Sequence, residues 1–236
     1  AEELGIERRL RGAAVVSSTR DSSRLAANAR ARVVARYAAE SGIEATLAAI
    51  DDSLAVLTDS AARRDFLNAL EPGSRGDSVA LGDARFAVAI VDASARLDVN
   101  AAPAEHLARF FERFADPARA QSTARAIRAR IEGSDGRTVT PLRSLEELRT
   151  IPGVDERVLQ LAAPYLTVDG DGTINQAAAS DTVMVAAFGE LRDAPSRLLV
   201  ISRGWMRGHP LTHEIQGVYA IARDRLVLVH WRERTL

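Results

Sequence analysis

The sequence predicts an α+β fold in which a long N-terminal helix packs on an antiparallel sheet and a block of helices interrupts that sheet. Three observations support this prediction. Apolar residues recur at spacings of three and four over residues 5–57, an alternating run follows at 84–92, and three more alternating runs close the chain. A segment with helical spacing lies between the first alternating run and the other three. An insertion into one helix-plus-sheet unit is therefore the simplest arrangement.

The first element is a long amphipathic helix over residues 5–57. Charged and small residues separate its apolar positions, as on a helix with one buried face. We expect any bend at Ser41-Gly42, because glycine weakens a helix interior. The apolar positions of this helix include Leu25, Ala29, Val33, Tyr37 and Leu47.

The remaining elements follow in chain order. A second helix is predicted from about Ser60 to Leu70, where the turn sequence EPGSRGD ends it. The stretch ARFAVAIVD at 84–92 alternates between two apolar faces, which predicts a strand buried on both sides. Residues 103–163 return to helical spacing. Three strands are then predicted in SRLLVISRGWM, HEIQGVYAIAR and RLVLVHW.

Two segments of the chain repeat each other. LDVNAAPAEHLARFF at 97–111 and INQAAASDTVMVAAF at 174–188 align without a gap. Each combines an extended entry, a polar Asx position and a helix with the same apolar stripe. Such polar side chains accept hydrogen bonds from free backbone N–H groups at helix starts. We therefore interpret the following residues as capping groups rather than ligands: Asp98, Asn100, Asn175 and Ser180.

Composition narrows the class of partner. The 236 residues carry 32 acidic against 31 basic side chains, for a net charge of −1, and every basic residue is Arg. With this balance the chain has no excess of positive charge that would attract nucleic acid or an anionic membrane. We interpret the arginines at 24, 30, 32 and 36 as a solvated helix face, since Asp21 and Glu40 interleave with them.

The absence of cysteine excludes a disulfide framework, a thiol nucleophile and a cysteine zinc site. The sequence has no run of eighteen apolar residues, so it contains no segment that would span a bilayer. Because the chain begins without Met, we expect that a membrane or targeting segment lies upstream.

The stretch SLEELRTIPGVDERVLQLAAPYLTV at 144–168 has the pattern of a helix-hairpin-helix, which grips phosphate through backbone N–H groups. Here, however, Asp155 and Glu156 lie where a phosphate would arrive. We therefore expect the hairpin to serve packing, with Ile151 and Val154 in the core and Gly153 in the turn.

Candidates for metal binding and catalysis are few. His209 and His213 are four apart, but Pro210 opposes the helix that would pair them, so a loop is favoured over a metal site. A metal hydrolase that also uses Glu214 is the enzyme alternative. The turn VDGDGT at 168–173 offers Asp169 and Asp171 as calcium candidates, with a plain β-turn as the alternative because EF-hand spacing is missing. Nucleophile and dinucleotide motifs are absent, so we expect no enzyme.

Taken in this order, the motifs resemble the K-type minor pseudopilin of bacterial type II secretion (general secretion pathway protein K). The resemblance implies a pilin fold with an inserted helical domain of the SAM-like or helix-hairpin-helix-like type. Its expected parts are 1–95, the inserted 96–168, and 169–236. The matching stretches are RLAANARARVVARYAAESGIEATLAAI, FAVAIVDASARLDVNAAPAEHL, LEELRTIPGVDERVLQLAAPYLTV with GTINQAAAS, and LVLVHWRER.

The resemblance also implies a role. The protein would be a non-enzymatic subunit that initiates and caps the pseudopilus tip with the I- and J-type minor pseudopilins, at the periplasmic face of the inner membrane. Its only contact with the membrane would be a segment absent from this chain. The alternative is a binding module that recognises an exported protein or nucleic acid. The residues expected to bind partners are Leu25, Ala29, Val33, Tyr37 and Leu47.

Overall fold

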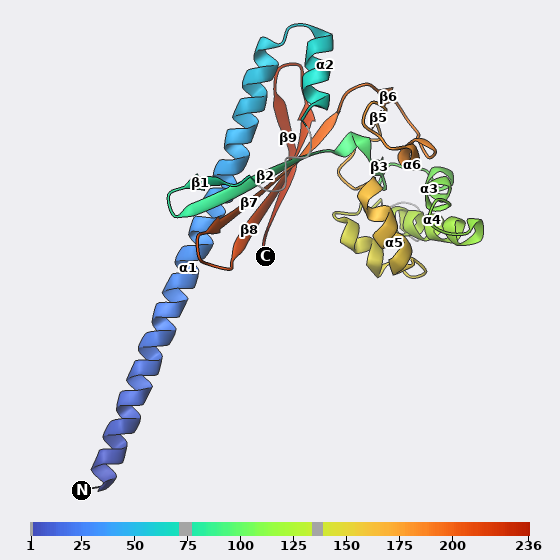
Figure 1. The fold of residues 1–236 in the computed structure, drawn as a ribbon. Coiled ribbons are helices and arrows are strands. Elements are labelled where there is room, and N and C mark those ends of the chain that lie inside the picture. Colours follow the sequence, from blue (N-terminus) through green and yellow to red (C-terminus); the bar gives the residue numbers. More distant parts are fainter. Residues whose placement is uncertain (1, 71–76, 134–138) are drawn as a thin grey trace.

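The computed structural model describes residues 2–70, 77–133 and 139–236, with side chains in these ranges from residue 22 onward. Its outline is dominated by helix α1 (Glu2–Val56), whose first part projects beyond the sheet and whose second part lies along it (Figure 1). The 55 residues of α1 correspond to a length of about 80 Å. The helix continues through Ser41 and Gly42, so the position expected to bend remains helical.

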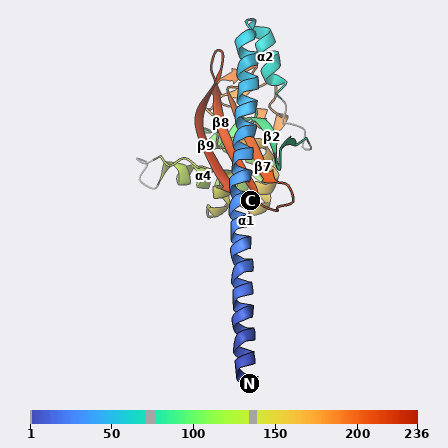
Figure 2. The same cartoon turned by 90° about the vertical axis from the view of Figure 1, so that its left-hand side faces the viewer.

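The main sheet has five antiparallel strands in the order β1-β2-β7-β8-β9. Helix α1 runs across one of its faces, as the view onto the helix shows (Figure 2). The three C-terminal strands confirm the alternation read from the sequence. The strands are β1 (Val79–Leu81), β2 (Ala84–Asp92), β7 (Arg197–Met206), β8 (Thr212–Ile221) and β9 (Leu226–Thr235).

Helix α2 (Ser60–Asn68) follows α1 and confirms the second predicted helix. The Asp59 side chain accepts a hydrogen bond from the Ala62 backbone N–H at 2.7 Å, which caps the helix start. Its buried Leu67 packs with Ile50 and Leu54 of α1. The two helices and the end of the sheet therefore share one small core.

The contact between α1 and the sheet depends on small side chains. Gly204 of β7 lies against the backbone of Ala35 and Ala39, and a Cβ at position 204 would overlap both. Gly42 of α1 in turn leaves room for the Ser202 side chain. Because no large side chain stands between them, the helix and strand backbones approach closely. The buried alanines of α1 at this contact are Ala31, Ala35, Ala38 and Ala39.

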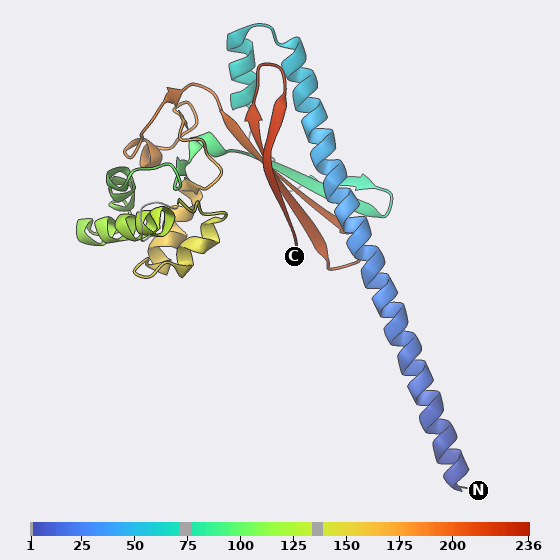
Figure 3. The same ribbon diagram turned by 180° about the vertical axis from the view of Figure 1, so that it is seen from behind.

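Residues 93–196 form an insert between β2 and β7, which are neighbours in the sheet. The two strands pair from Ala84↔Met206 to Asp92↔Leu198. The insert lies beyond the sheet on the side away from α1 (Figure 3). Its elements are η1 (Ala93–Ala95), β3 (Leu97–Asp98), α3 (Ala104–Phe111), α4 (Pro117–Glu132), η2 (Leu145–Thr150), α5 (Glu156–Ala162), η3 (Ala163–Tyr165), β4 (Leu166–Thr167), β5 (Ile174–Asn175), α6 (Asp181–Met184) and β6 (Leu191–Arg192).

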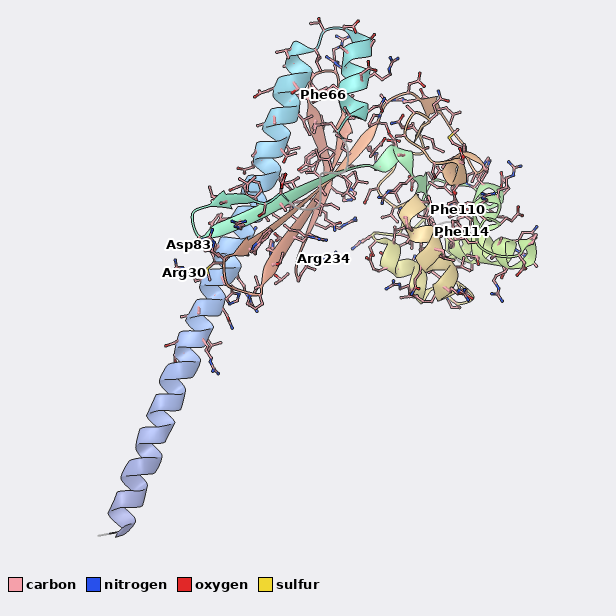
Figure 4. The ribbon with its side chains drawn as sticks, viewed as in Figure 1. Arg30, Phe66, Asp83, Phe110, Phe114 and Arg234 are labelled. Carbon is pink, nitrogen blue, oxygen red and sulfur yellow. The ribbon has the colours of Figure 1, made fainter. Side chains whose placement is uncertain are left out.

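The insert has its own hydrophobic core. The ring of Phe110 packs against those of Phe111 and Phe114, with centroids 5.2 and 5.3 Å away (Figure 4). The same cluster includes Val183 and Ala186 of the second repeat. Since those residues share the core, we propose that the inserted unit extends past the expected boundary at 168 and includes the second repeat.

The internal repeat is confirmed in its hydrogen bonds. Asp98 accepts from the N–H of Asn100 at 3.0 Å, and the aligned Asn175 accepts from the N–H of Ala177 at 3.2 Å. Ser180 accepts from the N–H of Val183 and caps α6. Asn100, the fourth residue expected to cap, plays a different part, because its side-chain amide bridges the backbone of Leu142 and Val168.

Two local predictions need correction. Strand β2 is half-buried at every position after Ala84, rather than buried on both sides. The first segment of the hairpin, η2, is a 3₁₀ helix rather than an α-helix. Ile151 is buried and Val154 packs against the insert core, so the hairpin serves packing as predicted.

The close contact at Gly204 leads to a test on α1. Ala35→Leu should lower the free energy of unfolding by about 1–3 kcal/mol, because a larger side chain must displace β7. Leu and Ala both favour helices, so helix propensity contributes little. The matched control is Ala48→Leu on the exposed side of the same helix, which should change the free energy by less than about 0.5 kcal/mol. Urea denaturation measures both, and equal losses would contradict this account of the contact.

Candidate functional site

One exposed apolar row follows the outer side of α1. Leu25, Ala29, Val33 and Tyr37 are four residues apart, so they lie along one side of the helix. The exposed fractions of Leu25, Val33 and Tyr37 are 70%, 53% and 64%. Apolar side chains this exposed in a row indicate an interaction surface. We call these four residues the outer stripe.

Leu47, the fifth residue expected to bind partners, is placed differently. It is partly buried and packs against the cluster that includes Ile43 of α1 and Val200 and Ile215 of the sheet. Its visible role is therefore to hold α1 on its own sheet, and a role in partner binding stays a prediction.

The sheet face opposite α1, here called the charged face, carries a cluster of charges beside apolar residues such as Leu199 and Val218. Glu214 of β8 is fully buried and lies between Arg203 of β7 and Arg234 of β9, its direct neighbours in register. Arg203 Nε donates to Oε2 at 2.6 Å, Arg234 Nε donates to Oε1 at 2.9 Å, and Gln216 Nε2 donates to Oε1 at 2.6 Å. Arg234 lies on the part of the sheet that faces the insert (Figure 4).

The titration of Glu214 follows from this setting. Burial alone would raise the pKa of its carboxyl group. Hydrogen bonds from Arg203 and Gln216, together with the charges of Arg203 and Arg234, outweigh burial and hold the pKa below its ordinary value. The carboxylate is therefore ionised at neutral pH and links three strands of the sheet.

A second set of charges joins the insert to the sheet. Arg232 of β9 forms two hydrogen bonds with the carboxylate of Asp169, at 2.9 and 3.2 Å, and Asp169 is 4% exposed. His230 Nε2 lies 3.2 Å from the same carboxylate, and Arg232 also donates to the Arg143 carbonyl oxygen at 2.8 Å. A cleft of about 360 Å³ lies beside these contacts, between the insert and the charged face.

The neck of the insert, where the chain leaves β2 and re-enters β7, is held by Ser94. Its Oγ accepts hydrogen bonds from the backbone N–H groups of Ser196 and Arg197, at 3.0 and 3.1 Å. Asn175 of the insert donates to Asp92 at 2.7 Å. Burial raises the pKa of the Asp92 carboxyl group, although this hydrogen bond opposes the rise. The insert is thus fixed at both crossings and at Asp169.

The calcium candidates are engaged with the protein itself. Asp169 faces Arg232 and His230, whereas Asp171 accepts hydrogen bonds from Thr173 in its own turn and from Ser196 directly before β7. In the described ranges, no group of three or more His, Cys, Asp or Glu residues could hold a metal ion. Calcium at this turn stays a prediction that these contacts do not favour.

The two histidines considered as metal ligands and the hairpin residue Asp155 each contact a different part of the protein. His209 lies 3.1 Å from the Asn28 amide oxygen, and His213 lies 3.2 Å from a Glu233 oxygen, so the two histidines do not meet at one site. At the hairpin, Asp155 accepts from two backbone N–H groups at the start of α5. Its own carboxylate therefore occupies the position that a phosphate would take.

Sequence analysis missed the two charge networks on the sheet. The available signal was Glu214 and Gln216 on one side of the strand HEIQGVYAI, opposite Ile215. Alternation places such residues on one face, but it does not say which arginine from another strand will lie beside them.

Comparisons with known proteins show what the fold is similar to. No family model matches the sequence, and no curated protein matches it. The structure is similar to a chain in the crystal structure of the GspK-GspI-GspJ complex from the enterotoxigenic Escherichia coli type 2 secretion system, with a TM-score of 0.64 and 12% sequence identity. The alignment covers 91% of this chain and 99% of that chain, so most of residues 93–196 must lie within it. The likeness confirms the predicted α+β fold.

Among the helices in the described ranges, none has the length and apolar character to cross a membrane.

The Glu214 network leads to a prediction about pH. Glu214→Gln should lower the free energy of unfolding by about 1–2 kcal/mol at pH 7, because it removes the charge that two arginines face. The folded-state pKa of Glu214 is depressed, so this stability is present above the ordinary pKa of 4.5 and is lost as pH falls through the folded value. The difference between variant and wild type should therefore shrink below pH 4.5. Urea denaturation at pH 7 and 3.5 checks this, with the exposed Glu112→Gln as control; a difference as large at pH 3.5 as at pH 7 would contradict the ionic account.

Proposed function

We propose that this chain is a K-type minor pseudopilin, a non-enzymatic subunit of a type II secretion pseudopilus. The observation that carries the proposal is the fold likeness to a chain of the GspK-GspI-GspJ complex, which extends over 99% of that chain. The resemblance of the sequence motifs, which does not depend on the structure, points to the same family. In this proposal the partners are the I- and J-type minor pseudopilins.

We further propose that the subunit lies at the tip, where it initiates and caps the assembly. The insert of residues 93–196 extends sideways from the sheet, on the side away from α1 (Figures 1 and 3). A helical assembly grows when each subunit accepts an identical one above it. A subunit that carries a bulky domain on one side obstructs that addition, which supports a terminal position.

The alternative, a module that binds nucleic acid, has less support. The near-neutral net charge provides no basic footprint, and Asp155 occupies the start of α5 in the hairpin. Recognition of an exported protein by the insert stays open as an addition to the tip role. Anchoring in the inner membrane, with the described domain in the periplasm, belongs to the same proposal.

The outer stripe is the surface that we propose for partner helices. Its side chains lie on α1, the element that projects farthest from the sheet, and they do not face the core. We expect the soluble domains of the I- and J-type proteins from the same genome to form a one-to-one-to-one complex with this chain, measured by size exclusion with light scattering. The absence of a complex at tens of micromolar would refute the assembly role.

The stripe itself is tested by a matched pair of substitutions. Val33→Asp should weaken the complex by about tenfold or more, because it buries an unpaired charge at the interface. Leu161→Asp makes the same kind of change on the insert, at a side chain that is also 53% exposed. This control should leave the complex intact. If only Leu161→Asp lost binding, the result would show that the interface lies on the insert and not on α1.

A further inference from the structure

Between residues 22 and 56, the charges of α1 are sorted by sign along the helix. From residue 22 to 39 the chain carries four arginines and no carboxylate, whereas from residue 40 to 56 it carries four carboxylates and no arginine. The arginines are Arg24, Arg30, Arg32 and Arg36, and the carboxylates are Glu40, Glu44, Asp51 and Asp52.

The acidic and basic residues of this stretch differ in the contacts that they make within the fold. Asp51 has a role inside the fold, since it accepts a hydrogen bond from the Leu226 N–H at 2.7 Å. Arg24 and Arg32 are exposed and have no ion pair with any residue whose side chain the structure describes. Exposed charges without an ion pair among the described side chains can be matched by opposite charges on a partner.

Two of the arginines border the outer stripe. At about 100° per residue, the stripe turns through about 120° around α1 from Leu25 to Tyr37. On the same scale, Arg32 lies about 20° outside the Leu25 edge of this arc. Arg30 lies about 20° outside the opposite edge, at Tyr37. One arginine therefore stands on each side of the apolar row.

The border arginines are available for a partner. Arg30 has one carboxylate nearby, Asp83 in the turn between β1 and β2 (Figure 4), at 3.9 Å. Those two side chains are 71% and 84% exposed, so this pair contributes little. Arg36 differs, because it binds Glu40 at 2.9 Å and lies 3.6 Å from Glu233.

We propose that the outer stripe receives a helix of a partner pseudopilin that carries carboxylates along both borders of its own apolar face. Charged residues beside an apolar seam set partner choice and orientation in packed helices. Arg30 and Arg32 each gain a carboxylate in this arrangement, while the apolar rows pack between them. The inference rests on the proposed function, since the partner is another subunit of the same assembly.

An anionic membrane is the less suitable occupant. The net charge of the chain is −1, so the chain has no excess of positive charge to attract anionic lipid. Here the arginines stand on the two sides of the apolar row, as in a packed helix pair.

The test measures affinity against salt. The full chain is titrated with the soluble I- and J-type domains by biolayer interferometry at 50 and 500 mM NaCl, and the Kd should rise about tenfold at the higher salt. The variant that combines Arg30→Glu and Arg32→Glu should bind about tenfold more weakly than wild type at 50 mM and lose most of the salt dependence. Glu has nearly the helix propensity of Arg, so α1 is preserved.

The control combines Arg113→Glu with Arg125→Glu on the insert. Both arginines are exposed and lack ion pairs with described residues, and the change in net charge is identical. The control should bind within about twofold of wild type. A control that loses affinity as strongly as the α1 variant would overturn the assignment, because net charge alone would then govern binding.

The other outcomes separate the two proposals. A complex whose Kd is the same at both salt concentrations, or that tolerates the reversal of Arg30 and Arg32, would overturn the acidic partner helix and leave the assembly role standing. The absence of any complex at 50 mM NaCl would overturn both. Salt-sensitive dimers of this chain alone, or binding to anionic vesicles at the expense of the partner domains, would show that the stripe takes a different occupant.

Discussion

The close approach of α1 to β7 at Gly204 is the constraint on which the rest of the structure depends. With Ala35 and Ala39 against the strand backbone, α1 has a single rotation that fits. A rotation that turned Val34 or Arg36 toward β7 would place a larger side chain at a contact where the backbones lie so close that a Cβ on residue 204 would overlap α1. The outward direction of Val33 and Tyr37 therefore follows from packing on the other side of the helix, rather than from any property of the exposed residues.

The sheet has two faces with different chemistry, and β8 belongs to both. Ile215 packs under α1, while Glu214 and Gln216 point to the other side, in agreement with the alternation of a strand. The charged face suits a partly covered surface: Glu214 is buried but satisfied by two arginines, and Arg232 still reaches Asp169 in the insert. A fully apolar face would need complete cover, which the insert does not provide, since a cleft remains beside Asp169.

Local pattern was sufficient for the long helices, the long strands and the repeat, but it missed the short strand β1 and predicted an α-helix where η2 is a 3₁₀ helix. Helical spacing predicted α1, α2 and the helices of the insert, and alternation predicted β7 to β9. Local pattern could not predict which residue of another strand lies beside a given residue in the sheet. Asp169 illustrates the limit: the turn composition indicated a calcium candidate, whereas the register of β9 places Arg232 and His230 beside it. Burial of Leu47 depends in the same way on the rotation of α1, to which the close contact with Gly204 of a distant strand contributes.

The outer stripe and the insert lie on opposite sides of one sheet, and this placement couples them mechanically. Helix α1 is fixed to β7 at Gly204, and the insert is fixed to β7 through Ser94 and to β9 through Arg232. Since β7, β8 and β9 are joined by continuous pairing and by Glu214, neither attachment can shift without breaking hydrogen bonds between strands. An assembly that holds α1 in place would thereby also determine the direction in which the insert projects. That is the property a terminal subunit needs if its added domain is to obstruct further growth.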